Sequence, residues 1–532
     1  MGWPQLNKVT LFLWVVILVI VLAGMLPLIY MFAKSVYING ELTFRLFTSI
    51  LHTKKEWTLL LNSLRLAALV SIFATFIGVF LGLLLGKTDL PFKHLFALLF
   101  TAPLLMPPYI MAVAWSDLLS PYGGLLSFIP YHLQQTMVDL LFSFSGAVMV
   151  LTIIYTSVPM LLTMAFLNTI DPKLEQAARL MASWRIVLKE ITLPLIAHGI
   201  CFSFLLVFIL VLGEFSVPSF LHVPVFSVES FTQFSASYDF ESATAQAMPL
   251  TLIVLLLLLF ESFFLHQNTY SITPFASDKI CTIKLGRKTA PFLMGLLIML
   301  FIFVCLPFLG LAATSKGFKT YLLTFSYAGD SLIRSLIYAF EGATLLTVLG
   351  FFMGYIIHKK ALKAWKLADQ ICFFLFAIPG TVLGIGLIKL WNRPVTSFVY
   401  SSFLIIIIGY IARYIALPTR IMAAQFLQIP PSQEEAAQVL GISWLKRIIF
   451  ILAPLSKPGI AAAWLVSFLF CLRDTDVTML LYPPGSDTLP VRIFTMMANG
   501  SPEIISALCM IMVFLALLFA SILMLIWRKT GG

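Results

Sequence analysis

The sequence predicts an all-α membrane protein with about 12 transmembrane helices arranged as two parallel six-span repeats. Its composition, its apolar segments and the similarity between its two halves carry this prediction. Of the 532 residues, 60% are hydrophobic and only 11% are charged, whereas a soluble protein carries about 25% charged residues. A single soluble core also stops growing at about 250–300 residues. Much of the apolar surface must therefore face lipid.

Twelve segments are apolar over roughly the 20 residues that a helix needs to cross a bilayer. Because backbone polar groups in lipid must be bonded internally, all twelve should be helices, with kinks at Pro107, Pro108, Pro159 and Pro379. The first segment is longer than a signal-peptide core, so we expect it to be retained. The predicted spans are roughly 11–33, 58–86, 94–118, 142–168, 194–213, 246–265, 290–312, 334–357, 368–391, 399–420, 455–472 and 505–527.

Lysine and arginine divide unequally between the two sides of these spans. If the N-terminus lies inside, the inner segments hold 20 of them and the outer segments hold 9. The outer loops 116–141 and 214–247 contain none. This positive-inside asymmetry places both termini in the cytoplasm. The net charge of +11 is therefore explained by the orientation of the chain in the lipid bilayer, and no nucleic-acid partner is expected.

The two halves of the chain resemble each other. Residues 62–90 align without a gap on 334–362, and Ser63, Leu64, Thr75, Gly78, Phe80, Gly82, Lys87 and Leu90 meet identical residues. Residues 167–200 resemble 427–460 at offsets of 259 and 260. We therefore expect a first repeat over 1–270, a cytoplasmic linker over 271–289 and a second repeat over 290–532. Both motif copies lie between equivalent spans, so the repeats are parallel.

Each copy of the second motif predicts a short cytoplasmic helix, near 171–186 and near 431–448. In the first copy Asp171 can cap the helix, with Pro172 at its first position. In the second copy, Ser432 followed by Glu435 forms the pattern of a capping box, and Gly441 permits a sharp turn. A charged loop with an interfacial helix is the alternative. Two copies with the same spacing favour a shared function instead.

This motif resembles the EAA motif of importer permeases of the ATP-binding-cassette (ABC) superfamily. The second copy, EEAAQVLG with a downstream ILAP, fits the motif well. The first, EQAARLMA with a downstream ITLP, has Gln176 where Glu is usual and Met181 or Ala182 where Gly is usual. The resemblance implies a type I ABC importer permease fold whose coupling helices dock on an ATPase. It assigns that docking to Glu175, Gln176, Ala177, Ala178 and Ala182, and to Glu434, Glu435, Ala436, Ala437 and Gly441.

The ATPase is expected on another chain, because no GxxxxGK[ST] string, the nucleotide-binding motif, occurs in this sequence. Two copies of the ATPase are expected, one for each coupling helix. The chain would then be a transport subunit without enzymatic activity. The resemblance also implies a periplasmic or surface substrate-binding protein as partner and a place in the bacterial cytoplasmic (inner) membrane. Alternating access, with the ATPase closing and dragging both coupling helices, would move the substrate.

Residues 103–115 and 472–500 are similar to the ferric-iron permease subfamily, which makes ferric iron the expected substrate. Thiamine and aminoethylphosphonate remain open, because relatives with this layout import them. A secondary transporter driven by an ion gradient is less favoured, since it leaves the duplicated motif unexplained. A membrane enzyme is disfavoured because no nucleophile–base string or histidine pair is found.

Glu214 and Asp474 lie 260 positions apart, each at the end of the fifth span of its repeat. Because charges near spans are costly, the two carboxylates are candidates for lining a cation pathway. Alternatively, they pair with Arg473 or with the binding protein. Glu341 and Arg413 are candidates for a buried ion pair. No His, Cys and carboxylate cluster has metal-ligand spacing, so neither a metal site nor a cofactor is expected.

Overall fold

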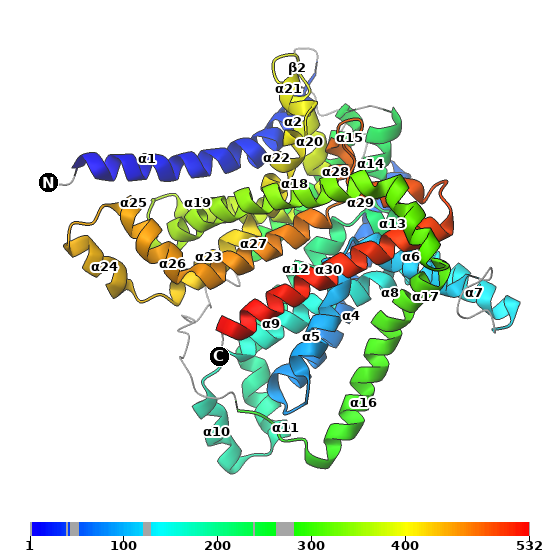
Figure 1. The fold of residues 1–532 in the computed structure, drawn as a ribbon, viewed down its shortest axis with the longest axis horizontal. Coiled ribbons are helices and arrows are strands. Elements are labelled where there is room, and N and C mark those ends of the chain that lie inside the picture. The colour runs from blue at the N-terminus through cyan, green and yellow to red at the C-terminus, as the bar shows by residue number, and fades with distance from the viewer. Residues whose placement is uncertain are drawn as a thin grey trace.

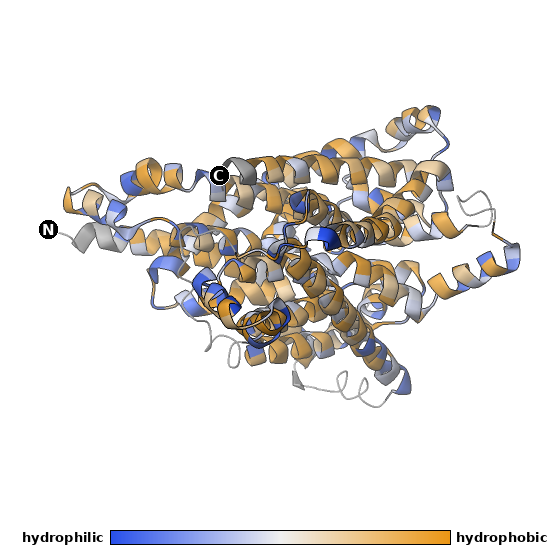
Figure 2. Ribbon diagram, turned by 90° about the horizontal axis from the view of Figure 1, so that it is seen from below, coloured by the Kyte–Doolittle hydropathy of each residue, from blue (hydrophilic) through white to orange (hydrophobic). Residues whose placement is uncertain are grey.

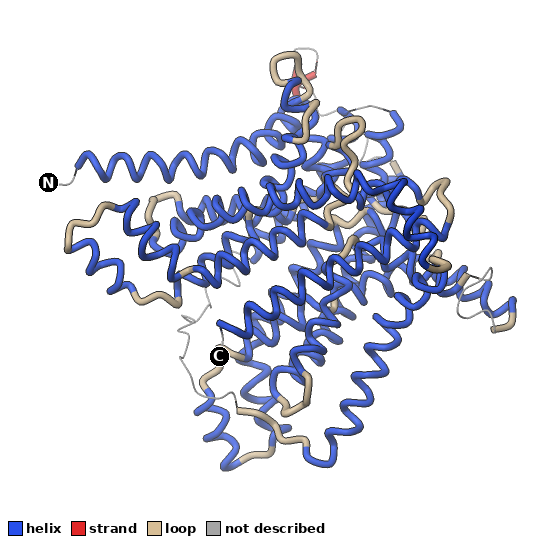
Figure 3. Tube along the Cα trace, viewed as in Figure 1, coloured by secondary structure: helices blue, strands red, loops and turns tan. Residues whose placement is uncertain are grey.

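The computed structural model describes residues 3–38, 41–42, 53–120, 129–237, 240–261 and 281–530. Almost all of this part of the chain is helical (Figures 1 and 3). The described β structure is the two-residue pair β1 (Tyr37–Ile38) and β2 (Glu41–Leu42), with an isolated bridge between Thr88 and Ile283. The predicted all-α class is confirmed. Hydrophobic residues run along the helices, and many of the hydrophilic ones gather at helix ends and loops (Figure 2).

The first half contains six spans that overlap the predicted ones, and the last four residues of the predicted span 246–265 lie outside the described residues. They are α1, η1 and α2 (Trp3–Ile20, Val21–Met25, Leu26–Val36); α4 (Lys54–Lys87); α5, η2 and α6 (Lys93–Thr101, Ala102–Leu105, Pro108–Leu119); α8 and α9 (Phe144–Tyr155, Ser157–Leu167); α11, η3 and α12 (Trp184–Val187, Leu188–Thr192, Leu193–Leu212); and α15 (Phe240–Phe260). Shorter helices join them: α7 (Tyr131–Leu141), α10 (Pro172–Met181), α13 (Ser216–Phe220) and α14 (Phe226–Ser237).

The second half repeats this order. Its spans are η6, α16, η7 and α17 (Gly286–Lys288, Thr289–Leu300, Phe301–Cys305, Leu306–Thr314); α18 (Phe318–Lys359); α19 and α20 (Trp365–Ala377, Gly380–Trp391); α22 and α23 (Leu404–Tyr414, Ala416–Leu427); α25, η8, α26 and α27 (Trp444–Arg447, Ile448–Leu452, Ala453–Leu455, Lys457–Leu472); and α30 (Pro502–Thr530). The shorter helices are α21 (Ser397–Tyr400), α24 (Pro431–Val439), α28 (Thr478–Leu481) and α29 (Leu489–Met496).

Four of these spans are bent pairs of helices. Eight spans qualify as single helices, and the bent pairs raise the total to 12 within the described residues. The bends at Pro107–Pro108 and at Pro379 measure 97° and 105°, so kinks are confirmed at these prolines. The span that contains Pro159 is not among those bent by more than 40°. Two further bends of 52° and 78° lie just before Pro418 and Pro458.

A π-helical turn precedes a proline at four equivalent places. The turns η1, η3, η7 and η8 end two residues before Pro27, Pro194, Pro307 and Pro454. Proline removes one backbone donor and its ring crowds the preceding turn, and a widened turn relieves this. The same local solution therefore occurs twice in each half.

Glycines on α4 and α18 allow close packing on the fourth span of each half. An added Cβ at Gly78 would lie 2.5 Å from the carbonyl oxygen of Thr156, and one at Gly350 would lie 2.5 Å from Cβ of Pro418. Gly82 and Gly354 meet α9 and α23 in the same way. Spans two and four of each half thus form a tight pair, as small residues permit in membranes.

The first span of each half packs against the other half. Gly24 meets the side chain of Leu375 on α19, and Gly310 on α17 meets Leu118 on α6. The side chains of Leu296 and Leu300 on α16 join the core of the first half. The two repeats are therefore interlocked rather than separate bodies.

Candidate functional site

The two copies of the duplicated motif form α10 and α24, which lie toward the same end of the bundle. Both chain termini lie toward this end, which we name the motif end, and α7 and α21 lie away from it (Figure 1). The helix, turn and second helix predicted for each copy are present as α10 with α11 and as α24 with α25.

The two helices begin differently. The Asp171 side chain accepts a hydrogen bond of 2.9 Å from the backbone N–H of Lys173, with Pro172 at the first helical position. The predicted cap of the first copy is confirmed. The predicted capping box of the second copy is wrong, because α24 already begins at Pro431 and Pro430 occupies the N-cap position. Ser432 therefore lies inside the first turn, where it cannot serve as the cap.

The two helices also end differently, as the sequence predicts. Gly441 has φ +74° and nothing within 4 Å of an added Cβ. This left-handed conformation favours glycine at the end of a helix. The first copy leaves its helix in extended backbone at Ala182. The glycine turn is thus confined to the second copy.

Three of the predicted docking residues are buried within the protein. Glu175 and Glu434 are buried, with 0% and 6% of their surface exposed. Ala437 is also buried, and Ala178 and Ala182 are half-buried. The exposed members of the predicted set are Gln176, Ala177, Glu435, Ala436 and Gly441.

An exposed apolar pair ends each motif helix. Leu180 and Met181 are 88% and 95% exposed, and Val439 and Leu440 are 87% and 79% exposed. The two pairs are 259 positions apart. These pairs were not predicted, although two adjacent apolar residues at the same place in both copies could have indicated an exposed apolar surface. Exposed apolar groups at matched positions are typical of a docking surface.

The carboxylate of Glu214 lies buried near the end of α12. Its oxygens accept hydrogen bonds from the Tyr155 hydroxyl at 3.1 Å, from the Ser216 backbone N–H at 3.0 Å and from the Ser216 hydroxyl at 2.6 Å. Only 5% of the residue is exposed. Three donors therefore satisfy this carboxylate within the protein.

Asp474 has similar surroundings in the second half, although its hydroxyl donor lies four residues further along the chain instead of two. It accepts from the Tyr414 hydroxyl at 2.5 Å, from the Thr478 backbone N–H at 2.9 Å and from the Thr478 hydroxyl at 2.6 Å. Tyr155 and Tyr414 are 259 positions apart. Neither tyrosine was predicted from the sequence, although their spacing matches the offset between the two repeats and could have identified them.

Two arginines near these acids bond to helix breaks rather than to the predicted partners. Arg473 donates to the Leu104 carbonyl, at the break between η2 and α6 of the other half. Arg413 donates to the Ile378 carbonyl at the break between α19 and α20. It also lies 3.7 Å from the Asp476 carboxylate. The proposed Arg413 and Glu341 pair is therefore wrong, because the bend at Pro379 offers Arg413 a free carbonyl and Asp476 lies beside it.

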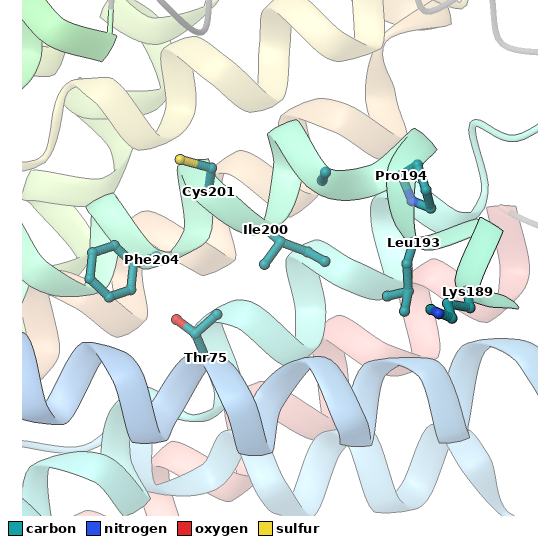
Figure 4. Close-up of a pocket in the computed structure, with 8 residues that line it drawn as sticks. Thr75, Lys189, Leu193, Pro194, Ile200, Cys201 and Phe204 are labelled. Atoms are coloured by element: carbon teal, nitrogen blue, oxygen red, sulfur yellow. The ribbon is translucent and has the colours of Figure 1, made fainter. Parts of the chain in front are cut away.

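Two cavities in the described part of the chain are lined by residues other than Glu214 and Asp474. One of about 540 Å³ lies between α4 and α12, with Thr75, Cys201 and Phe204 on its wall and Lys189 at one end (Figure 4). A second of about 550 Å³ is lined mainly by apolar side chains such as Phe73, Phe100 and Met299. Such apolar linings suit acyl chains better than hydrated ions. No three His, Cys, Asp or Glu side chains of the described residues could jointly hold a metal ion.

Comparison with known proteins agrees with this architecture. Residues 346–529 match the family of binding-protein-dependent transport system inner membrane components. The chain is 24% identical over 453 residues to the putative ferric transport system permease protein FbpB 1 of Haemophilus influenzae, covering 81% of this chain and 71% of that protein. It is 25% identical to the ferric transport system permease protein FbpB of Actinobacillus pleuropneumoniae, covering 80% of this chain and 64% of the relative. It is 23% identical to the putative 2-aminoethylphosphonate transport system permease protein PhnV of Salmonella typhimurium, over 46% of this chain and 97% of that protein.

The fold and the duplicated motif define a multi-pass membrane permease of the ABC type. The similarity to inner membrane components of binding-protein-dependent transport systems lies within the second half, over residues 346–529.

Proposed function

We propose that this permease imports ferric iron into the cytoplasm, driven by two copies of a separate ATPase. The observation that carries the ATPase part is the pair of matched exposed apolar patches, Leu180 with Met181 and Val439 with Leu440. Both lie on helices at the motif end, beside exposed polar side chains such as Gln176 and Glu435. An apolar centre with a polar rim suits a protein partner.

The motif end faces the cytoplasm in this proposal, together with both termini. The inside excess of lysine and arginine supports this orientation, since 20 such residues fall on this side and 9 on the other. The opposite end would then face a periplasmic or surface binding protein.

Transport follows from the coupling of ATPase closure to the two motif helices. The ATPase dimer need only bind one arrangement of α10 and α24 better than the other. Moving the population from 1:99 to 99:1 takes about 10⁴-fold preference, or about 5.5 kcal/mol. Because each half carries one motif helix, closure of the dimer would move the halves against each other and alternate access.

Ferric iron is the substrate that the relatives favour, since two of them are named for ferric transport. The two buried carboxylates Glu214 and Asp474 suit a cationic cargo, and their place in the pathway is part of this proposal. Aminoethylphosphonate is the second candidate, because a relative named for it matches 46% of the chain. Thiamine is supported only by the resemblance of the overall layout.

Co-purification followed by ATP hydrolysis tests the proposal. The tagged chain is extracted from native membranes, and the associated ATPase is identified by mass spectrometry. ATP hydrolysis by the reconstituted complex is then measured with binding proteins loaded with ferric iron, aminoethylphosphonate or thiamine. We expect stimulation by the ferric form. Transport by the purified chain alone, driven by a proton or sodium gradient, would contradict the proposal.

Replacing both Val439 and Leu440 with aspartate should abolish docking of the second motif helix. Burying a Val or Leu side chain is worth about 1.5–3 kcal/mol, so losing both should weaken this contact by roughly a hundredfold or more. The measurement is the amount of ATPase retained by the tagged chain. Leu367→Asp is the matched control, since Leu367 is 58% exposed but lies on α19 outside the motif helices. Equal retention by both variants would disprove the docking role.

A further inference from the structure

Each motif helix is joined to the long helix of its own half by an ion pair whose glutamate is buried. In the first half, the Lys87 ammonium contacts the Glu175 carboxylate, and only 2% and 0% of these side chains are exposed. In the second half, the Lys359 ammonium lies 2.9 Å from the Glu434 carboxylate, with 29% and 8% exposed. Lys87 and Lys359 are the last residues of α4 and α18.

The two ion pairs are equivalent in the repeat. The lysines are 272 positions apart and the glutamates 259 positions apart, which are the offsets that align the two segments. Four positions thus give the same contact twice, even though the motif helices differ in how they begin and end. This recurrence points to a role common to both halves.

Further donors fix each glutamate. The Thr192 hydroxyl in η3 donates to the second oxygen of Glu175 at 2.7 Å. In the second half, the Tyr355 hydroxyl on α18 donates to Glu434 at 3.2 Å. We name these groups the first junction (Lys87, Glu175, Thr192) and the second junction (Lys359, Glu434, Tyr355). Each holds its motif helix in one orientation against the bundle.

Each junction also contacts a segment outside its own motif helix and long helix. At the first, the backbone N–H of Ile283, on the way into the seventh span, donates to the Lys87 carbonyl at 2.7 Å. At the second, the Trp444 indole N–H donates to the Tyr355 hydroxyl at 3.2 Å. The ring of Phe12, from the first span, lies 5.8 Å from that of Trp444. The first junction is therefore tied to the segment that leads into the second half, and the second junction is linked through Trp444 to the first span of the first half.

Stability alone does not account for the two ion pairs. A buried ion pair is often no more stable than apolar side chains of similar volume, while removal of one partner is costly. Its distinctive property is directional, because charged hydrogen bonds fix the relative position of the elements that they join. At the junctions these elements are the motif helix and the long helix that packs through Gly78 or Gly350 on the fourth span.

We propose that the two Lys–Glu pairs are the joints that transmit movement of the motif helices to α4 and α18. Glu175, Glu434, Lys87 and Lys359 are positioning residues in this view, while the exposed residues of the motif contact the partner. The inference rests on the proposed ATPase coupling. It assigns the buried glutamate of each motif copy to force transmission and not to docking.

Hydrogen–deuterium exchange tests the joint without any partner. In the purified full-length chain, Lys87→Met with Glu175→Gln should raise the exchange rates of the α10 amides at least tenfold. Glu190→Gln is the control, because Glu190 forms an exposed pair with Lys189 at 3.6 Å and should leave α10 unchanged. Lys359→Met with Glu434→Gln provides the same test on α24, should the first double variant fail to fold. Unchanged exchange in a folded variant would overturn the proposal.

The reconstituted complex gives the second readout. We expect the double variants to retain the ATPase and to hydrolyse ATP, while substrate moved per ATP falls at least tenfold. Lys87→Arg, which keeps the charge, should restore most of the coupling. Unchanged transport per ATP would overturn the joint role. A wild-type chain that binds no ATPase would contradict the proposed function instead, and the exchange comparison would still decide whether the pair holds α10.

Discussion

Replacing Gly350 with leucine is expected to disrupt the second half of the permease. An added Cβ at this position would lie 2.5 Å from Cβ of Pro418 and 2.9 Å from its carbonyl carbon. Backbone atoms of α23 cannot move aside as a flexible side chain would. Overpacking a tight core costs about 1–3 kcal/mol, and leucine carries three carbons beyond Cβ. We therefore expect a melting temperature several degrees lower and a smaller yield of monodisperse protein in detergent.

Gly295→Leu is the matched control for this substitution. Gly295 also lies within a helix, α16, but nothing stands within 4 Å of an added Cβ. Gly78→Leu should behave like Gly350→Leu, because its Cβ would meet the Thr156 carbonyl oxygen at 2.5 Å. If Gly350→Leu and Gly295→Leu melt at the same temperature, close packing of α18 on α23 does not stabilise the fold.

The spans and their pairing into repeats were predictable from the sequence, but the partner of each first span was not. Length and apolar composition determine that 11–33 and 290–312 cross the membrane. A helix that is apolar all round does not reveal which neighbour it packs against. The contacts of Gly24 with Leu375 and of Gly310 with Leu118 join residues that are far apart in the chain. The structure was therefore needed to show that the first span of each half packs against the other half.

Some bends in the spans were also predictable from the sequence, and others were not. Adjacent prolines at 107 and 108 indicate a break directly, and the 97° bend there follows. Pro159 and Pro418 occupy equivalent positions. Of these two positions, Pro418 follows a bend above 40°, whereas the span that contains Pro159 is not bent to that degree. A proline frees a carbonyl and crowds a turn, but the packing of neighbouring helices decides how far the helix opens.

The repeat in the sequence predicted where the motif helices lie. It did not predict which of their side chains are buried, because burial is set by contacts with residues far away in the sequence. Glu175 and Gln176 are adjacent in the sequence, yet one is buried and the other exposed. Lys87, the partner of Glu175, lies 88 positions away. The identical lysines at 87 and 359 were visible in the aligned segments, but nothing in the sequence connected them to the glutamates.

The double variant Glu214→Gln with Asp474→Asn should reduce ferric iron uptake at least tenfold. The measurement is radioactive ferric iron entering proteoliposomes that contain the permease together with the proposed ATPase and binding protein. Removing both charges takes away the groups that would attract a cation near the interface of the two halves. Retention of the ATPase should not change, because neither residue belongs to the motif helices. Glu190→Gln, at an exposed site, is the control.

Tyrosine variants separate charge from structure at the same two sites. Tyr155→Phe with Tyr414→Phe removes one donor from each carboxylate and keeps both negative charges. If the carboxylates act on the cargo, the phenylalanine variant should keep most of the uptake that the amide variant loses. If they only satisfy the donors of Ser216 and Thr478, both variants should melt earlier while uptake per folded molecule stays normal. That second outcome would remove Glu214 and Asp474 from the pathway and leave them as structural groups that brace the end of the fifth span in each half.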